Sequence, residues 1–396
     1  MSEWDEMALT ELGTVERGKS RHRPRNDPSL YGNEVPFFQT GDVKAATLHM
    51  RNPSQWYSAK GVAQSRIWES GIACITIAAN IAETAILGCR GCFPDSVLGF
   101  TPTYQKADAY FVKYLIDVYR GELTSAARGT AQDNLSLEKL LSYRFRVPGA
   151  PARARIVGTL RAFDDLIENN RRRVEVLEEM ARAIYREWFV HFRYPGHENA
   201  TLVESACGPI PEGWQVGRVD SHLVLQRGFD LPASERRPGP IPVVGASGRQ
   251  GFHSTAKTQG PGLTTGRSGT VGTVTYVPGD FWPLNTSLWV KEFRLSTPRS
   301  AYFLLSSLDL AQAASGAAVP TLNRNVVHAL PAVCPPRALI EEWDGAALPI
   351  FNSMELLRLQ SERLVEIRNL LLPKLVSGEI DVSSIDRVAV VEDSAA

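Results

Sequence analysis

The sequence matches itself at two fixed distances, and this internal repeat is the feature that most restricts the fold. Trp4 and Gly18 align with Trp214 and Gly228, a shift of 210 residues. A second set aligns with a shift of 187: Gly129, Ala131, Leu135, Pro148, Leu177 and Glu179 match Gly316, Ala318, Leu322, Pro335, Leu364 and Glu366. Because 210 minus 187 is 23, the second copy is 23 residues shorter between these landmarks. The chain is therefore a tandem duplication with a constant framework and a variable interior.

Each copy ends in a segment with the apolar seam of a coiled coil, in which seam residues alternate at steps of four and three. The first seam is Ile156, Leu160, Phe163, Ile167, Asn170, Val174, Leu177, Ala181, Ile184 and Trp188. The second seam is Trp343, Ala347, Ile350, Met354, Leu357, Ser361, Leu364, Arg368, Leu371 and Leu375. We expect two long helices that pack antiparallel. About 34 residues per helix give a rod of roughly 50 Å, longer than one turn of B-DNA at about 34 Å.

Polar residues and helix breakers interrupt both seams. Asn170 is either a polar contact that sets the register or a tolerated polar residue near a bend. In the second seam, Gly345 and Pro349 are expected to kink or delay the first turns. Ser361 and Arg368 are expected to weaken the packing further. The straightness of this helix is therefore an open point.

The interior of each copy contains short apolar runs between turn residues, such as VPFFQTGDV in the first and GLTTGRSGTVGTVTYV in the second. Alternating Thr and Val with closely spaced glycines predict short strands and tight turns. Each copy is therefore expected to form an α/β or mainly β domain with exposed loops. Eight glycines between Gly245 and Gly272 would let the backbone approach a ligand closely.

Residues Gly13–Ser20 match G-x-x-x-x-G-K-[ST], the phosphate-binding loop of nucleotide hydrolases. The second copy has Leu223 and Phe229 in place of Gly13 and Lys19, so the repeat does not keep the motif. Prolines follow within ten residues, where such a loop needs a helix. We favour a basic loop of Lys19, Arg21, Arg23 and Arg25 that meets a phosphate backbone, with a plain solvated loop as the alternative.

The remaining composition gives little evidence of chemistry. Lys and Arg total 43 and so do Asp and Glu, so the net charge indicates neither nucleic acid nor membrane. Five scattered cysteines fit the reduced thiols of a cytoplasmic protein, and no signal peptide or membrane span is predicted. Cys89 and Cys92 lack two further ligands for zinc, while Asp117 and His253 lack catalytic partners. We expect a recognition protein that is not an enzyme and has no metal.

Several segments resemble one protein family. The order W-x8-G-x4-G from Trp4, the segments PEGW and LEEMARAIYREWFVHF, and above all the decapeptide LLPKLVSGEI are similar to the specificity subunit of type I restriction-modification systems. The segments GRSGTVG and FWPLNTSL resemble the second recognition domain of that family. The resemblance covers nearly the whole chain and leaves out only the last sixteen residues, from Asp381.

The resemblance implies a mixed α/β (α+β) fold in which two similar target recognition domains are separated by two long antiparallel coiled-coil helices. It places the first recognition domain at residues 1–150 and the first spacer helix at 151–195. The second recognition domain then spans 196–335 and the second spacer helix 336–380, and residues 381–396 are expected to form a disordered tail. A pseudo-two-fold axis would relate the two copies.

The resemblance also implies a function. Each domain would read one half of a bipartite, asymmetric site in double-stranded DNA, while the helices set the gap and dock two methyltransferase subunits. Restriction and translocation subunits would complete the complex. No cofactor is expected in this chain, because S-adenosylmethionine belongs to the methyltransferase partner and ATP with Mg to the restriction partner. The chain would also hold deformed DNA, since adenine must leave the duplex to be methylated.

No short motif fixes which side chains read bases, so the candidate residues follow from chemistry. Arg and Lys are expected to contact phosphates, and Gln and Asn to read adenine. The first domain contributes Lys19, Arg21, Arg23, Gln39, Thr40, Arg128, Gln132 and Asn134; the second contributes Arg227, Ser247, Arg249, Gln250, Arg267, Ser268, Asn285, Asn323 and Arg324. Two alternatives stay open: an orphan DNA-binding module without a modification partner, and a nucleotide hydrolase that uses Gly13 to Ser20.

Overall fold

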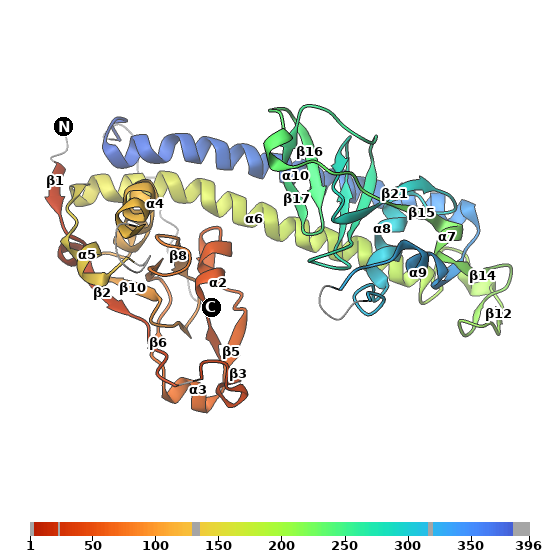
Figure 1. The fold of residues 1–396 in the computed structure, drawn as a ribbon, viewed down its shortest axis with the longest axis horizontal. Coiled ribbons are helices and arrows are strands. Elements are labelled where there is room, and N and C mark those ends of the chain that lie inside the picture. Colours follow the sequence, from red (N-terminus) through yellow and green to blue (C-terminus); the bar gives the residue numbers. More distant parts are fainter. Residues whose placement is uncertain (1–3, 23, 129–134, 316–319, 383–396) are drawn as a thin grey trace. The chain divides into compact units, whose positions relative to one another are not determined.

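The computed structural model describes residues 4–22, 24–128, 135–315 and 320–382 of the chain. Contacts divide the chain into two compact units (Figure 1): unit 1 comprises residues 1–172 and 358–396, and unit 2 comprises residues 173–357. Arg23, Gln132, Asn134 and the tail from residue 383 lie outside the described residues. Within the described ranges, none of the helices combines the length and apolar character that a membrane span needs.

Unit 1 contains two open sheets and a strand pair. The strand order is β2-β10-β7-β8-β4 in the five-stranded sheet and β5-β3-β9-β6 in the four-stranded sheet, while β1 pairs with β11. The elements are β1 (Trp4–Met7), α1 (Leu9–Leu12), β2 (Gly13–Arg17), η1 (Pro28–Leu30), β3 (Tyr31–Phe37), α2 (Thr40–Ala45), β4 (His49–Met50), β5 (Gln55–Tyr57), α3 (Ala59–Ala63), β6 (Ile67–Trp68), β7 (Ala73–Thr76), β8 (Thr84–Leu87), β9 (Gly91–Cys92), β10 (Val97–Pro102), α4 (Ala107–Arg128), α5 (Leu137–Ser142) and β11 (Phe145–Pro148).

Residues near both ends of the chain complete the core of unit 1. Helix α4 packs on strands β7, β8 and β10, and its fully buried Phe111 and Leu115 share one apolar cluster with Leu375 and Val376 near the C-terminus. Gly378 follows the last helix with φ of +82°, and a side chain there would collide with the ring of Trp4. Glycine is therefore required at this point of the LLPKLVSGEI segment.

Unit 2 repeats this architecture with one strand fewer in each of its two open sheets. Its sheets have the orders β15-β21-β18-β19 and β17-β16-β20, with the strand pairs β14-β22 and β12-β13. The elements are η2 (His197–Asn199), β12 (Leu202–Val203), β13 (Ile210–Pro211), β14 (Gln215–Arg218), α7 (Val219–His222), β15 (Leu223–Arg227), η3 (Ala233–Glu235), β16 (Ile241–Gly245), β17 (Gly248–His253), β18 (Gly262–Gly266), β19 (Val274–Val277), β20 (Trp282–Pro283), β21 (Ser287–Phe293), α8 (Pro298–Ser307), α9 (Arg324–Ala329) and β22 (Pro331–Cys334).

The two units match element by element at the distances found in the sequence. In β1 and β11, Met7 lies opposite Phe145, and in β14 and β22 Gly217 lies opposite Ala332, which is the same pair shifted by 210 and by 187 residues. The order β2-β10-β7-β8 is repeated as β15-β21-β18-β19. The expected mixed α/β class with an internal duplication and two long helices is confirmed.

The long helices are α6 (Ala150–Phe189) and α10 (Arg337–Ser377). In unit 1 the first half of α6 lies beside the second half of α10 (Figure 1), where Asp164 pairs with Arg368. In unit 2 the second half of α6 packs on the first half of α10, where Ala181 shares a cluster with Phe351. The two pairings are antiparallel, and every predicted seam position is buried or half-buried.

Pro349 does not interrupt α10, and the expected delay of its first turns is wrong. The helix begins at Arg337 and continues through both Gly345 and Pro349 to Ser377. Proline removes the N–H that would bond to the carbonyl of Gly345, but both residues are exposed, so water can satisfy that carbonyl. The hydroxyl of Ser353 donates to the carbonyl of Pro349 at 2.8 Å.

Candidate nucleic-acid interface

In unit 2, four loop segments meet beside the four-stranded sheet, and hydrogen bonds, most of them between main-chain groups, hold them together. The N–H groups of Arg267 and Ser268 donate to the carbonyl of Thr286 at 2.9 and 3.2 Å. The N–H of Ala246 donates to the hydroxyl of Thr286 at 3.3 Å, and that of Leu322 to the carbonyl of Arg267 at 2.8 Å. We call residues 246–247, 267–268, 285–286 and 322–324 the unit 2 loop cluster.

Unit 1 has the same cluster built from different side chains. The N–H of Ile77 donates to the carbonyl of Ser96 at 3.0 Å, and that of Leu135 donates to the carbonyl of Ile77 at 3.0 Å. These bonds match those of Arg267 and Leu322, because 267 minus 77 and 286 minus 96 are both 190, and 322 minus 135 is 187. Ile77 and Ala78 of unit 1 thus stand where unit 2 has Arg267 and Ser268.

The unit 2 loop cluster brings together most of the candidate DNA-binding residues of the second domain. Ser247, Arg267, Ser268, Asn285 and Asn323 lie on its loops, and Arg324 begins α9 beside Asn323. Asn285 donates its amide to Asp230, while Gln250 on β17 reaches the hydroxyl of Ser247 at 3.5 Å. Arg227 is exposed at the end of β15. The guanidinium of Arg249 lies 5.0 Å from the ring of Phe252.

The first-domain candidates are more scattered. Gln39 and Thr40 start α2, and the amide of Gln39 donates to Gln55 at 2.5 Å. Arg128 is the last residue of α4. Lys19 is half-buried and Arg21 is exposed, and the structure places both after β2. Arg23, Gln132 and Asn134 lie outside the described residues.

The phosphate-loop interpretation of Gly13–Ser20 is wrong. Residues Gly13–Arg17 form strand β2 in an antiparallel sheet, and among the described residues between β2 and β3 the one helical turn is the short η1. The N–H groups of Gly18 and Lys19, which a phosphate would need, donate to the carbonyls of Val97 and Phe93 at 2.9 and 3.0 Å. The motif is a sequence coincidence inside a strand.

The repeat explains why Gly18 is a glycine. Its added Cβ would collide with the carbonyl oxygens of Phe93 and Pro94, and at Gly228 the same atom would collide with those of Pro283 and Leu284. Phe229 donates its N–H to Pro283 at 2.8 Å, as Lys19 does to Phe93. The glycines therefore permit a close approach of two backbones, and no ligand is needed to account for them.

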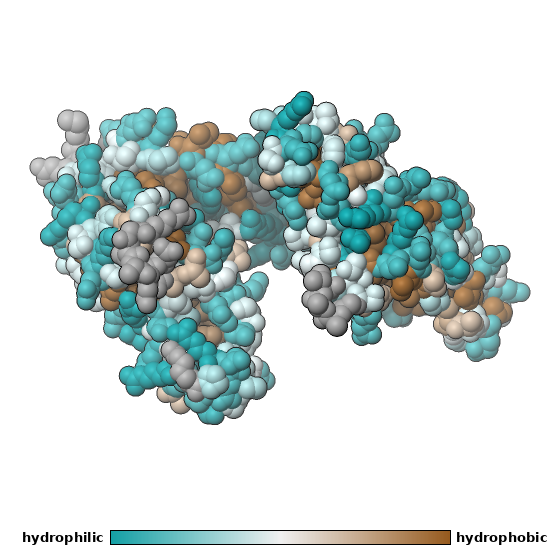
Figure 2. Space-filling model, in the orientation of Figure 1, coloured by the Kyte–Doolittle hydropathy of each residue, from teal (hydrophilic) through white to brown (hydrophobic). Residues whose placement is uncertain are grey.

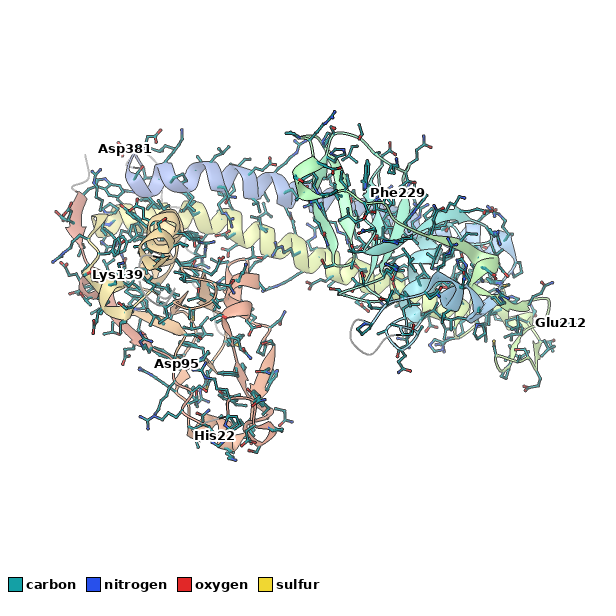
Figure 3. All side chains as sticks on the ribbon, viewed as in Figure 1. His22, Asp95, Lys139, Glu212, Phe229 and Asp381 are labelled. Atoms are coloured by element: carbon teal, nitrogen blue, oxygen red, sulfur yellow. The ribbon has the colours of Figure 1, made fainter. Side chains whose placement is uncertain are left out.

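The basic loop after β2 is partly neutralised. Arg25 forms an ion pair with Asp95 at 2.8 Å, and His22 contacts Asp27 at 2.9 Å. The N–H groups of Arg21 and His22 both donate to the side-chain oxygen of Gln64, at 2.5 and 3.0 Å. Figure 3 shows His22 and Asp95 at the same end of unit 1, which is where this loop lies.

A hollow of about 290 Å³ opens beside this loop. The hydroxyl of Ser20 lies 3.4 Å from that of Tyr57, and burial raises the pKa of the Tyr57 phenol, so the phenol keeps its proton. The hollow is lined by Ser20, Arg25, Tyr31, Gln39, Thr40 and Ser96, among others. Because Arg25 is paired with Asp95, the hydroxyls, the amide and the aromatic rings make the hollow suit a neutral planar group better than a phosphate.

Sequence reasoning missed some residues of these surfaces. Tyr31 and Tyr57 carry no motif, and they lie beside the hollow only because of the strand pairing of β3 with β5. In unit 2 the ammonium of Lys257 lies 5.2 Å from the ring of Phe229 and 5.3 Å from that of Trp282. Surfaces that bind nucleic acid combine aromatic rings, on which bases stack, with cations that meet phosphates. The sequence signal that could have found these residues is Phe229, an aromatic residue that stands in the second copy where the first copy has Lys19.

Residues that suggested chemistry have structural roles. Asp117 lies in α4, where burial alone would raise its pKa but Lys113 and Arg120 hold the pKa below its usual value. His253 is buried and accepts the N–H of Arg237 at 3.0 Å. Burial raises the pKa of the Cys92 thiol. Among the described residues, no group of His, Cys, Asp and Glu has the geometry to hold a metal.

Comparison with known proteins agrees with the resemblance seen in the sequence. Residues 1–179 match the family described as the type I restriction modification DNA specificity domain. The type I restriction enzyme MjaIX specificity subunit of Methanocaldococcus jannaschii is 22% identical over 419 residues, which cover 97% of this chain and 95% of that protein. A crystal structure of the S subunit of a type I restriction-modification system from M. genitalium has a TM-score of 0.56 at 13% identity and covers 94% of this chain and 96% of its own, so the two share a fold. The predicted resemblance is confirmed.

Proposed function

Residues 1–179 belong to the type I restriction-modification DNA specificity domain family, and from this premise we propose that the chain reads a two-part DNA sequence, one part with each unit. The observation that carries the proposal is the repeated loop cluster. The same pair of main-chain hydrogen bonds positions Ile77 in unit 1 and Arg267 in unit 2, and the next residue is Ala78 in unit 1 but Ser268 in unit 2. One framework thus presents two different surfaces, as recognition of an asymmetric site requires.

Each unit carries side chains for both kinds of contact that DNA recognition needs. In unit 2, Arg267 can donate to guanine or to a phosphate, and Asn285 or Gln250 can form paired hydrogen bonds with adenine. In unit 1, Lys19 and Arg21 supply phosphate contacts, and Gln39 lines the hollow. We assign the cations to positioning and the amides to base reading.

The long helices then set the distance between the two half-sites and dock two methyltransferase subunits. Large apolar side chains remain exposed on both helices, which fits a partner surface. They are Leu166, Val176 and Met180 on α6, and Leu348, Leu356, Leu359, Ile367 and Leu370 on α10. Figure 2 shows hydrophobic residues gathered on the visible face of α10. Because the chain is a duplication, it can offer similar surfaces to two copies of one partner.

In this proposal the chain does no chemistry itself. S-adenosylmethionine binds the methyltransferase partner, and ATP with Mg binds the restriction and translocation partner. The residues of this chain position the DNA so that an adenine turned out of the duplex meets the partner's site.

The proposal is tested by mapping N6-methyladenine in DNA from cells that carry this chain with its neighbouring methyltransferase, beside cells that lack only this chain. We expect a split, asymmetric motif that disappears without the chain. Identical maps would refute the proposal. If the purified chain then bound DNA but no methyltransferase, it would be an orphan binding module.

A further inference from the structure

A buried ion pair joins α6 to α10 inside unit 1. Asp164 of α6 is fully buried, and its carboxylate pairs with the guanidinium of Arg368 on α10. The hydroxyl of Tyr114 on α4 donates to the other oxygen of Asp164 at 2.6 Å. Burial raises the pKa of Tyr114 well above its ordinary value, so the phenol remains a donor. Three helices thus meet at one carboxylate.

This pair is not needed to fill the space between the helices. The residues equivalent to Asp164 and Arg368 in the other copy are Phe351 and Ala181, since 351 minus 164 and 368 minus 181 are both 187. Phe351 and Ala181 belong to one apolar cluster in unit 2. The same chain therefore shows an apolar solution at the same position. Because buried ion pairs are often no more stabilising than such apolar substitutes, the charges call for another explanation.

The explanation lies in the repeat of the seam. Leu357, Leu364 and Leu371 follow one another at intervals of seven, so these three leucines by themselves do not distinguish a slip of one heptad. The Asp164–Arg368 pair, in contrast, forms in only one register. A slip of seven residues would place Ser361 or Leu375 opposite Asp164 and leave a buried carboxylate without its guanidinium, which is strongly unfavourable.

We propose that the Asp164–Arg368 pair fixes the register of α10 against α6 and thereby restricts the DNA gap to one length. The inference rests on the proposed function, in which the helices set that gap. A heptad slip moves α10 along α6 by about 10 Å, which is the length of about three base-pair steps. Tyr114 extends the constraint to the sheet of unit 1, because α4 packs on that sheet.

The test uses the complete complex and a plasmid library in which the parental half-sites are separated by gaps of every length around the parental one. Two variants remove both charges. Asp164→Asn with Arg368→Met keeps the volumes and an acceptor for Tyr114, and Asp164→Phe with Arg368→Ala copies the other half of the chain. We expect methylation at non-parental gaps to rise at least about tenfold over the parent, because a buried charge no longer opposes the slip.

A matched control separates register from stability. Arg299 and Asp344 form a half-buried ion pair between α8 and α10 in unit 2 that involves no residue of α6. Arg299→Met with Asp344→Asn should lower methylation at every gap by the same factor. Arg368→Lys, which keeps a cation, should retain the parental gap.

Each remaining outcome is decisive. Folded charge-free variants that methylate only the parental gap would overturn the inference. Failure of both variants to fold would show that the pair is needed for packing, and the register role would be rejected. A parent chain that directs no split motif would instead refute the proposed function.

Discussion

Ala79 and Ala82 have left-handed backbones, with φ of 61° and 59°. The equivalent residues of unit 2 are Gly269 and Gly272, with φ of 85° and 83°, since both pairs differ by 190. A left-handed alanine costs about 1–2 kcal/mol, and glycine costs about 0.5–1 kcal/mol in extra chain entropy. Ala79 is exposed, so no burial is lost. We therefore expect Ala79→Gly to stabilise unit 1 by about 0.5–1 kcal/mol.

The assay is urea unfolding of the complete chain, followed by hydrogen–deuterium exchange of peptides from β7 and β8, which reports unit 1 alone. Ala82 is fully buried, so Ala82→Gly also loses a methyl group worth about 0.8 kcal/mol and should be nearly neutral. The reverse change Gly269→Ala should destabilise unit 2 by about 0.5–1 kcal/mol. Unchanged or lower stability for Ala79→Gly would refute the left-handed conformation, and with it the loop equivalence.

Three further predictions follow from the same structure. Lys19→Ala should weaken DNA binding evenly across sequences and lower by about one the slope of log binding constant against log salt concentration. The control is Lys139, whose ammonium donates to the carbonyl of Ala126. Lys139→Ala should leave the slope unchanged in the same filter-binding titration. Arg267→Ala should relax one half of the methylated motif by about 1–3 kcal/mol per contacted base; relaxation of both halves in the methylation map would contradict the assignment of one unit to each half-site. Burial lowers the pKa of His222 below its ordinary 6.5, so the unfolded chain takes up the proton first and stability should fall as the pH drops below about 6.5. His222→Leu, which copies Leu12 of the first copy, should flatten urea midpoints measured from about pH 7.5 to 5, apart from a residual slope from His328, whose pKa burial also lowers.

The sequence alone was enough to find the duplication and the long helices, because both depend on spacing. Gly18 recurs as Gly228 because each permits the same close approach of two backbones in its unit. The seam residues recur at a regular spacing because each helix buries one apolar stripe of its surface. Pro349 was misjudged because the cost of a proline depends on whether water reaches the freed carbonyl, which spacing does not show.

The loop clusters could not be predicted in the same way. Ile77 and Ala78 have no side chain that suggests recognition. Only the main-chain hydrogen bonds of Ile77 with Ser96 and Leu135 show that Ile77 matches Arg267, so that Ala78 matches Ser268. The phosphate-loop motif that begins at Gly13 did not indicate the local structure, because the same residues can form a strand, as Gly13–Arg17 do. The role of Arg368 depends on Asp164, which is 204 residues away in the sequence.

In the proposed function, main-chain contacts shape each loop cluster and side chains contact the DNA, which would let one fold read unequal sequences. The bonds that shape each cluster join N–H and carbonyl groups, such as Ile77 with Ser96 and Arg267 with Thr286, and every residue except proline carries both groups. Exchange of a side chain other than that of Thr286, whose hydroxyl accepts the N–H of Ala246, therefore leaves these bonds intact and alters what the surface can bind. The interface between α6 and α10 obeys the opposite rule, because the carboxylate of Asp164 and the guanidinium of Arg368 are the contact. Substitutions in the loops should change which bases are read, whereas substitutions at this pair should change how far apart the two half-sites lie.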